Sequence, residues 1–347
     1  MGEVSIRTHS QDFCPVCDRP GQRYYRNLRD DLFEVGGSWN IDKCTDNECG
    51  LYWLNPTPHV DDIWKLYIDY STHNEVFFSV KYTDIFHRFL QAVRDSVLST
   101  KLDYPLKHSS ALNKFLYFIS RIHPGWVDAQ LVNSFYVPWI DNGILLDVGC
   151  GSGSSMLTMK NLRWNVVGID FDKKAVKNAR SNGLTVHEGW LTDQKFPDNH
   201  FDRIIMNHVI EHISDPVALL AECHRILKPG GVLVAITPNA SSWGHYHYRK
   251  FWRGLEVPRH IRMFTSNSLI CIGQKAGFVK NEGFTTIQGN SYIRRSSHAF
   301  RKNNSFDIPS ETKKSRIFYH LWLFIDGWLS FIAPASNEVV VLRSRKG

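Results

Sequence analysis

The chain has 347 residues, of which 43% are hydrophobic and 22% charged, an ordinary composition for a folded protein. These values argue against wholesale disorder and against a protein with many membrane spans. A formal net charge of +7 suits a polyanionic partner such as a nucleic acid, a nucleotide-linked molecule or an anionic membrane surface. The basic residues stand in short, scattered clusters, so a solvated basic surface is the simplest interpretation and we do not expect a nucleic-acid partner.

Four of the seven cysteines stand in the first fifty residues, and their spacing indicates a metal site rather than disulfide bonds. Cys14 and Cys17 are two residues apart in the pattern CxxC, and Cys44 and Cys49 enclose four residues. Two pairs of thiolates suit a tetrahedral structural zinc ion, in which four protein ligands leave no open position. Reduced thiols without a metal are the alternative. The sequence therefore predicts a zinc-binding head over residues 1–57.

Residues 58–141 form an aromatic-rich connector with helical spacing. Apolar residues recur every three or four positions, as in amphipathic helices that pack one face on a core. The two stripes comprise Tyr82, Ile85, Phe86, Phe89, Leu90, Val93 and Val97, and then Leu112, Phe115, Leu116 and Ile119. We expect these residues to form helices that serve packing rather than ligand binding.

From residue 142 to residue 347, short apolar runs alternate with helical patterns. This alternation predicts βαβ units and hence an α/β fold with a doubly wound parallel sheet. The expected strands are 144–146, 166–169, 201–206, 232–236 and 338–342, and the expected helices are 154–161, 173–181 and 216–227.

A glycine-rich loop, DVGCGSG at residues 147–153, joins the first expected strand to the first expected helix. Glycines at such a turn let the backbone approach a ligand, and the amides at the helix start favour a polar group. The loop is spaced GxGxG, whereas the dinucleotide-binding fingerprint is GxGxxG. Asp170 ends the second expected strand, where a carboxylate can accept hydrogen bonds from both hydroxyls of a ribose. Loop and acid together predict a nucleoside site.

Four motifs resemble, in order, those of class I S-adenosylmethionine-dependent methyltransferases: LLDVGCGSG, VVGIDFDKKAV, FPDNHFDRIIMNHVIEHI and LKPGGVLVAITPN. The resemblance implies a Rossmann-like sheet of seven strands, completed by 338–342, and S-adenosylmethionine as the cofactor. It assigns the methionine part of the cofactor to Asp147, the ribose to Asp170 and the adenine to the side of Phe171. The full set of implied cofactor-binding residues is Asp147, Gly149, Gly151, Gly153, Asp170, Phe171, Leu191 and Asn207.

The chain departs from this family at Gly189, which the resemblance places in the loop after the relatives' third strand. Relatives often carry an acid directly after the glycine there, to meet the adenine amine, whereas this chain has Gly189 followed by Trp190. Asp193 is the substitute that we consider. A non-catalytic protein that retains the fold is an alternative, since fold alone does not dictate function.

A second resemblance narrows the acceptor. CPVC followed by CGLYWLNPTP, and later WRGLEVPRH within an acceptor-side loop at 238–265, resemble bacterial enzymes that methylate sugars and surface polysaccharides. The position of His260 before Phe264 and Thr265 is similar to the histidine segment of sugar C-methyltransferases, which implies that His260 accepts the acceptor's proton. His208 is the second predicted catalytic residue, and the rival histidines are His212, His245 and His247.

Three arginines in the acceptor-side loop have the chemistry to hold a phosphate, because guanidinium groups can bind phosphate oxygens bidentately. Such a contact would fit a nucleotide-linked sugar. Solvated surface arginines are the alternative. The three are Arg253, Arg259 and Arg262.

An apolar stretch at 317–334 follows Lys313, Lys314 and Arg316 and contains Asp326 and Gly327. We expect a helical insertion at 313–334 that packs on the protein, on a second subunit in a homodimer, or flat on an anionic membrane surface. The first thirteen residues carry charges and no apolar run, which favours a cytoplasmic protein without a secretory signal. Contact with the inner face of the membrane through 313–334 is the alternative location.

The function predicted from these features is methyl transfer from S-adenosylmethionine to a hydroxyl, or alternatively a carbon, of a sugar nucleotide or polysaccharide precursor. One alternative is a quinone-type or lipid-linked acceptor at the membrane surface, which the apolar stretch and its basic flank favour. A second alternative is a nucleic-acid-binding zinc module joined to a methyltransferase domain.

Overall fold

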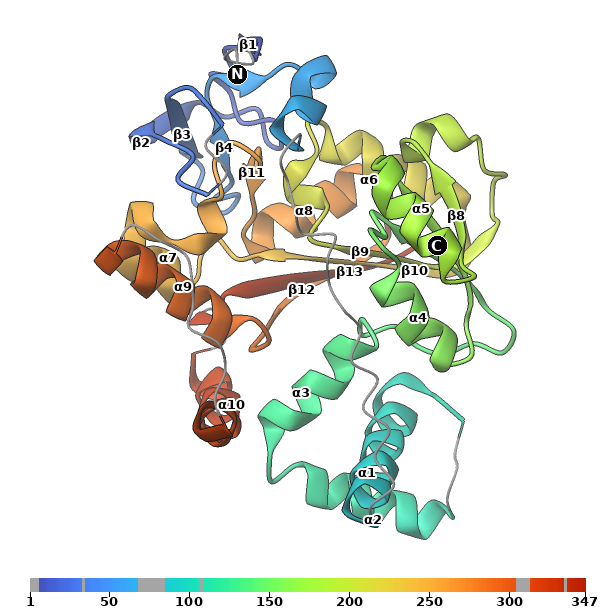
Figure 1. The fold of residues 1–347 in the computed structure, drawn as a ribbon. Coiled ribbons are helices and arrows are strands. Elements are labelled where there is room, and N and C mark those ends of the chain that lie inside the picture. Colours follow the sequence, from blue (N-terminus) through green and yellow to red (C-terminus); the bar gives the residue numbers. More distant parts are fainter. Residues whose placement is uncertain (1–5, 33–34, 68–84, 106–108, 304–312, 334–335) are drawn as a thin grey trace.

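The computed structural model describes residues 6–32, 35–67, 85–105, 109–303, 313–333 and 336–347. A seven-stranded sheet lies at its centre, with the cysteine-bearing head at one end of the molecule and the helices of the connector at the other (Figure 1). The acceptor-side segment lies beside the head, although more than 180 residues separate them in the chain.

The central sheet has the topology expected from the sequence, with one strand reversed. Across the sheet the order is β12-β13-β10-β9-β6-β7-β8. The last strand, β13, is inserted between β12 and β10 and runs antiparallel to both. The seven-stranded Rossmann-like fold is thus confirmed, but the sheet is mixed rather than wholly parallel. The strands are β6 (Ile144–Val148), β7 (Asn165–Asp170), β8 (Thr185–Glu188), β9 (Phe201–Asn207), β10 (Leu227–Pro238), β12 (Lys280–Thr286) and β13 (Val339–Arg345).

Both faces of this sheet are covered, because successive side chains of a strand point to opposite faces. Leu146 and Val148 of β6 pack in one core with α6 (Pro216–Ile226) and α8 (Ser266–Lys275). Leu145, which directly precedes Leu146 in the chain, packs in the other core with α4 (Ser154–Asn161). Burial on both faces explains why the strands appear in the sequence as continuous apolar runs rather than alternating ones. The helix α5 (Lys173–Ser181) packs its buried side in a third, smaller cluster.

The head is a small antiparallel sheet that takes one strand from the acceptor-side loop. Its own strands are β2 (Gly21–Leu28), β3 (Trp39–Cys44) and β4 (Tyr52–Leu54), and β11 (Arg262–Met263) pairs with the free edge of β4. A separate pair, β1 (Thr8–His9) and β5 (Thr57–Pro58), closes the outer side. The head and the acceptor-side loop therefore hold each other in place.

In the described part of the connector there are three α-helices and a 3-10 helix. The helices α1 (Ile85–Leu102) and α2 (Ser110–Ser120) contain the two apolar stripes, which confirms their helical prediction; Tyr82 lies outside the described residues. A third helix, α3 (Pro124–Asn133), starts at a proline, which is tolerated in the first turn. The 3-10 helix η1 (Val60–Tyr67) leads from the head to the edge of the central sheet.

The apolar stretch near the carboxyl end forms α10 (Lys313–Ile332), which crosses α3 at two glycines. A Cβ on Gly125 would come within 1.9 Å of a backbone carbonyl oxygen of α10, and one on Gly327 within 2.4 Å of the Gly125 nitrogen. Asp326 beside this crossing is buried and accepts a hydrogen bond from Arg294. Gly327 therefore packs against α3 and Asp326 bonds to Arg294, and neither residue interrupts the helix α10.

Among the described residues, none of the helices is both long enough and apolar enough to cross a membrane. Another face of α10 is exposed and carries Leu321, Trp328, Leu329 and Ile332. Contact of this face with a second subunit or with a membrane surface stays a prediction.

Arg259 joins the head to the acceptor-side loop through a buried ion pair. Its guanidinium donates two hydrogen bonds of 2.9 Å to Asp30 in the head and one of 3.2 Å to Glu256. Arg253 pairs with the same Glu256, and the buried Arg262 donates to backbone carbonyl oxygens. The prediction that these arginines hold a phosphate is contradicted for Arg259 and Arg262, which are internal. For Arg253, which pairs with Glu256, it stays a prediction.

Replacing Asp30 by alanine is expected to lower the free energy of unfolding by about 3–5 kcal/mol, because the buried Arg259 loses its bidentate partner. Denaturant unfolding followed by circular dichroism measures the loss. Asp31→Ala is the matched control: its side chain is exposed, and its removal should change the free energy by less than about 0.5 kcal/mol. Equal losses in the two variants would contradict the assigned role of the Asp30–Arg259 pair.

Candidate active site

A cleft runs along the carboxyl edge of the central sheet, where the strands β6, β7, β8 and β9 end. Its walls also include η1, which brings Ile63 and Tyr67 over the edge. Of the predicted residues, the cleft is lined by Gly149, Gly151, Asp170, Phe171, Leu191, Asn207 and His208. Asp147, Gly153 and His260 lie behind this lining.

The glycine loop is held in a backbone conformation that other residues rarely adopt. Gly149, Gly151 and Gly153 have φ values of +72°, +53° and +91°. A Cβ on Gly149 would lie 2.4 Å from Val209, and one on Gly153 would lie 2.2 Å from Leu184, whereas Gly151 faces open space. Gly149 and Gly153 therefore permit close packing of the loop, and Gly151 leaves room for a ligand beside the backbone.

Asp170 fixes the loop and also faces the cleft. One carboxylate oxygen accepts a hydrogen bond of 2.8 Å from the Gly151 amide, and the other accepts one of 2.8 Å from the Asp172 amide. A carboxylate oxygen can accept more than one hydrogen bond, so Asp170 also has the chemistry to accept from ligand hydroxyls. This position at the end of β7 supports the predicted contact with a ribose.

Asp147 carries a buried polar atom without a partner. Its side chain is 1% exposed, and its Oδ2 accepts no hydrogen bond from the described part of the chain. Burial, with the neighbouring charge of Asp170 as a second cause, raises the pKa of Asp147 well above its usual value. An unpartnered buried carboxyl oxygen is costly, and a ligand's ammonium group that reached it past the glycine loop would satisfy it. The donor set thus fits the amino-acid end of S-adenosylmethionine.

An aromatic group forms the other end of the cleft. Phe171 stacks on Trp190 with ring centroids 4.9 Å apart, and Tyr67 meets Phe171 edge-on at 5.6 Å. Leu191 lines the same end. These apolar faces suit a flat heteroaromatic ring such as adenine. Asp193, the substitute for the missing acid, is not among the described residues that line the cleft.

His208 lies where β9 ends, and its side chain is 46% exposed toward the cleft. Its Nδ1 lies 3.1 Å from Oε1 of the buried Glu211. Burial would lower the pKa of His208, but the hydrogen bond and charge of Glu211 outweigh it and raise that pKa. The pair therefore has the geometry of an oriented base and its carboxylate partner.

His260 lies one layer deeper, behind His212. The two imidazole centroids are 4.9 Å apart, and His212, not His260, lines the cleft. The Nδ1 of His260 lies 2.8 Å from the Gly254 carbonyl oxygen, and burial lowers the pKa of His260 to about 4. The two remaining rival histidines lie apart from the cleft lining: His245 is buried against Tyr25, and His247 stacks on Trp243.

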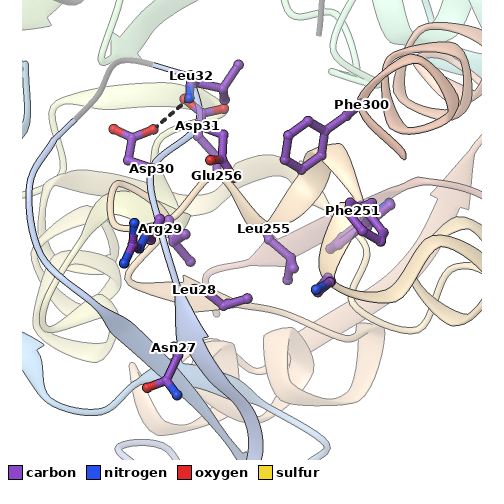
Figure 2. A pocket seen from close by; sticks show the side chains of 13 residues that line it. Asn27, Leu28, Arg29, Asp30, Asp31, Leu32, Phe251, Leu255, Glu256 and Phe300 are labelled. Carbon is purple, nitrogen blue, oxygen red and sulfur yellow. Dashed lines mark hydrogen bonds between the residues drawn. The ribbon is translucent and has the colours of Figure 1, made fainter. Parts of the chain in front are cut away.

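A second hollow lies between the head and the acceptor-side loop (Figure 2). Figure 2 shows Phe251 and Phe300 on one side of it and the backbone turn carrying Arg29 and Asp30 on the other. Glu256 lines this hollow, and its Oε2 is 3.9 Å from Nε2 of His260. The hollow and the cofactor cleft are therefore separated by the layer that contains Glu256 and His260.

The four cysteines of the head converge, as their spacing predicts. The sulfur atoms of Cys14 and Cys49 are 3.7 Å apart, those of Cys17 and Cys44 are 3.2 Å apart, and all four lie within 4.8 Å of one another. All are free thiols. Four thiolates around a zinc ion with Zn–S bonds of about 2.3 Å lie roughly 3.8 Å apart, so the cluster fits such an ion.

Comparisons with known proteins agree with this geometry. Residues 129–282 match a family model described as a methyltransferase domain. A probable S-adenosylmethionine-dependent methyltransferase of Mycolicibacterium smegmatis is 33% identical over 42% of this chain and 55% of its own length. A ubiquinone biosynthesis O-methyltransferase of Cereibacter sphaeroides is 38% identical over 27% of this chain and 41% of its own length. A protein of the same description from Thiobacillus denitrificans is 28% identical over 38% of this chain and 70% of its own length.

The chain therefore carries a class I S-adenosylmethionine-dependent methyltransferase domain. It spans about half the length of the first two of these relatives. The matched residues include β6 to β10 and the acceptor-side loop, whereas the head, α10 and β13 lie outside them.

Sequence reasoning missed the contribution of η1. Ile63 and Tyr67 belong to a segment without a recognisable motif, and the Tyr67 hydroxyl reaches the cleft to lie 2.9 Å from Nδ1 of His212. The EH pair at 211–212 was the available signal for the inner end of the site, since both residues carry chemistry directly after an expected strand.

Asp170→Ala is expected to weaken S-adenosylmethionine binding by at least about tenfold, because it removes the charged acceptor for the ribose hydroxyls. Isothermal titration calorimetry measures the change. Asp193→Ala is the control and should leave the affinity unchanged, since Asp193 does not line the cleft. An unaltered affinity in the Asp170 variant would remove the ribose assignment.

Proposed function

We propose that this protein is an enzyme that transfers a methyl group from S-adenosylmethionine to a hydroxyl group of an acceptor molecule. The observation that carries the proposal is a buried carboxyl oxygen of Asp147 that has no hydrogen-bond partner among the described residues. It lies beside the glycine loop, one strand away from Asp170. An ammonium group and a ribose at these two positions would place the sulfonium between them and the residues that follow β9. The family match and the names of the relatives support the same donor.

The chain's own residues would bind the donor, align the acceptor and remove one proton. Bound S-adenosylmethionine supplies a methyl group on a good leaving group, so no further activation of the donor is needed. His208 is placed to take the proton of the acceptor hydroxyl, since its ring borders the cleft and its Nδ1 is held by Glu211. The Glu211 carboxylate would stabilise the imidazolium that results.

Two acceptor classes have specific support. A phenolic quinone precursor is supported by relatives described as ubiquinone biosynthesis O-methyltransferases. A sugar hydroxyl is supported by the resemblance of the cysteine head and the WRGLEVPRH stretch to enzymes that modify sugars. The burial of Arg259 and Arg262 removes the argument for a nucleotide phosphate at this site, so a sugar acceptor need not be nucleotide-linked.

We also propose that Cys14, Cys17, Cys44 and Cys49 hold a structural zinc ion. The Thr265 hydroxyl donates a hydrogen bond of 2.8 Å to the carbonyl oxygen of Cys49. The metal would therefore stabilise the acceptor-side loop as well as the head. It would take no part in methyl transfer, because four thiolates leave no open position.

Labelled S-adenosylmethionine incubated with a panel of catechol-type quinone precursors and sugar nucleotides is expected to give one O-methylated product, detected by mass spectrometry. His208→Asn should lower kcat by about 100-fold without weakening donor binding. His298→Asn, which changes an exposed histidine of α9 (Asn290–Asn303), is the control. A product methylated on carbon, or an unchanged kcat in the His208 variant, would contradict the proposed reaction or base.

Zinc analysis of the purified chain is expected to give about one ion per molecule, with the ion lost in Cys44→Ser. The thermal midpoint should then fall by more than about 5 °C, because the head and β11 lose their anchor. Cys271→Ser is the matched control, since Cys271 packs against the same core but lies outside the cluster. Full zinc content in the Cys44 variant would contradict the assignment.

A further inference from the structure

Three metal-binding side chains converge between the cofactor cleft and the second hollow. They are Glu211 and His212 of the 3-10 helix η4 (Ile210–His212) and His260 of the acceptor-side loop. One ligand atom from each lies within 4.8 Å of the others. His212 lines the cleft directly, so an ion at this position would lie at the inner end of the donor site.

Both histidines are held in the orientation of metal ligands. His260 Nδ1 lies 2.8 Å from the Gly254 carbonyl oxygen, and His212 Nδ1 lies 3.0 Å from the Arg259 carbonyl oxygen. A carbonyl oxygen only accepts, so each Nδ1 carries the hydrogen and each Nε2 keeps a free lone pair. The Tyr67 hydroxyl oxygen, 2.9 Å from His212 Nδ1, shares the same hydrogen. A backbone acceptor behind each imidazole is the usual arrangement behind metal-bound histidine.

Glu211 supplies an oxygen that has no other use in the described structure. Its side chain is 1% exposed; Oε1 lies against His208, and Oε2 has no hydrogen-bond partner among the described residues. A buried anionic oxygen without a partner is costly, and a cation would offset that cost.

The surrounding charges also favour a cation. Besides Glu211, the carboxylates of Glu256 and Asp30 face this region, and the guanidinium groups of Arg253 and Arg259 pair with them. The two guanidinium groups balance Asp30 and Glu256, so the charge of Glu211 is unbalanced while its neighbour His208 is neutral. Glu256 Oε2 lies 3.9 Å from His260 Nε2, close enough to add to the negative electrostatic potential at this position.

We propose that Glu211, His212 and His260 bind a divalent first-row transition-metal ion such as Mn²⁺. Two imidazoles and one carboxylate suit such ions, and three protein ligands leave open positions for other oxygen atoms. On the basis of the proposed function, we infer that the open coordination positions of the ion bind the oxygen of the acceptor hydroxyl, or the oxygens of two neighbouring hydroxyls of a catechol or sugar. The acceptor would therefore be a chelating diol.

The ion would act as a Lewis acid that lowers the pKa of the bound hydroxyl. The hydroxyl proton passes to His208, the oxygen forms a bond to the methyl carbon, and the carbon–sulfur bond breaks with its electron pair left on sulfur. The step needs no oxidant or reductant. Glu211 would connect the metal ion with the base, because one of its carboxylate oxygens would bind the ion and the other would accept a hydrogen bond from His208.

Titration of the full-length, zinc-loaded protein with MnCl₂ alone, followed by electron paramagnetic resonance, tests the metal site without any acceptor. About one bound Mn²⁺ per chain is expected, with ¹⁴N couplings from imidazole in electron spin-echo spectra. Glu211→Gln and His260→Gln should each weaken binding at least tenfold. Because Mn²⁺ prefers oxygen and nitrogen ligands to thiolates, the zinc-loaded cysteine cluster should not compete for it.

His245→Asn is the matched control. His245 is also buried with Nδ1 against a backbone carbonyl oxygen, but its Nε2 already lies 3.1 Å from the Tyr25 hydroxyl. It should leave Mn²⁺ binding unchanged. Calorimetric binding of S-adenosylmethionine confirms that each variant is folded, because the Asp170 end of the cleft does not include the changed residues.

Absence of bound Mn²⁺ in wild-type protein that binds S-adenosylmethionine would overturn the metal site while leaving the proposed methyl transfer intact. Binding without nitrogen couplings, or binding unchanged in the Glu211 and His260 variants, would overturn it as well. Conversely, Mn²⁺ binding with these couplings but no methylated product would support the site and count against the proposed function.

Discussion

The buried contact among Asp30, Arg259 and Glu256 is the constraint on which the acceptor side of this molecule depends. It joins the head to a loop more than 200 residues later in the chain, and the pairing of β11 with β4 extends the junction. Ionic groups this deeply buried tolerate little displacement, because separating them leaves a desolvated charge. Arg259 also offers its carbonyl oxygen to His212, so the junction orients a side chain of the cleft.

The donor side of the site could be predicted from the sequence because it is built from local backbone chemistry. A glycine loop after a strand, and an acid at the end of the next strand, occupy fixed places in a βαβ unit, so linear spacing determines where they meet. The seven-stranded sheet followed from the same regularity. The reversed direction of β13 did not, since an apolar strand pattern carries no information on strand direction.

The acceptor side depends on contacts between distant segments and was predicted less well. Arg259 and Arg262 looked like phosphate ligands because composition alone does not reveal burial, and each is enclosed by groups far away in the sequence. His260 was identified by likeness to a family, but its place behind His212 required the fold. Tyr67 was missed because η1 has no motif, and only the three-dimensional path of the connector brings it to Phe171.

The sharing of one small sheet by the head and the acceptor-side loop has a consequence for how such proteins diversify. An exchange of the loop alone between two relatives would leave the edge of β4 unpaired and Asp30 facing a foreign side chain. The head and residues 238–265 thus form a single module for inheritance and for design, although the connector and the strands β6 to β10 separate them in the sequence. A recombination event that keeps this module intact would have to transfer both segments together.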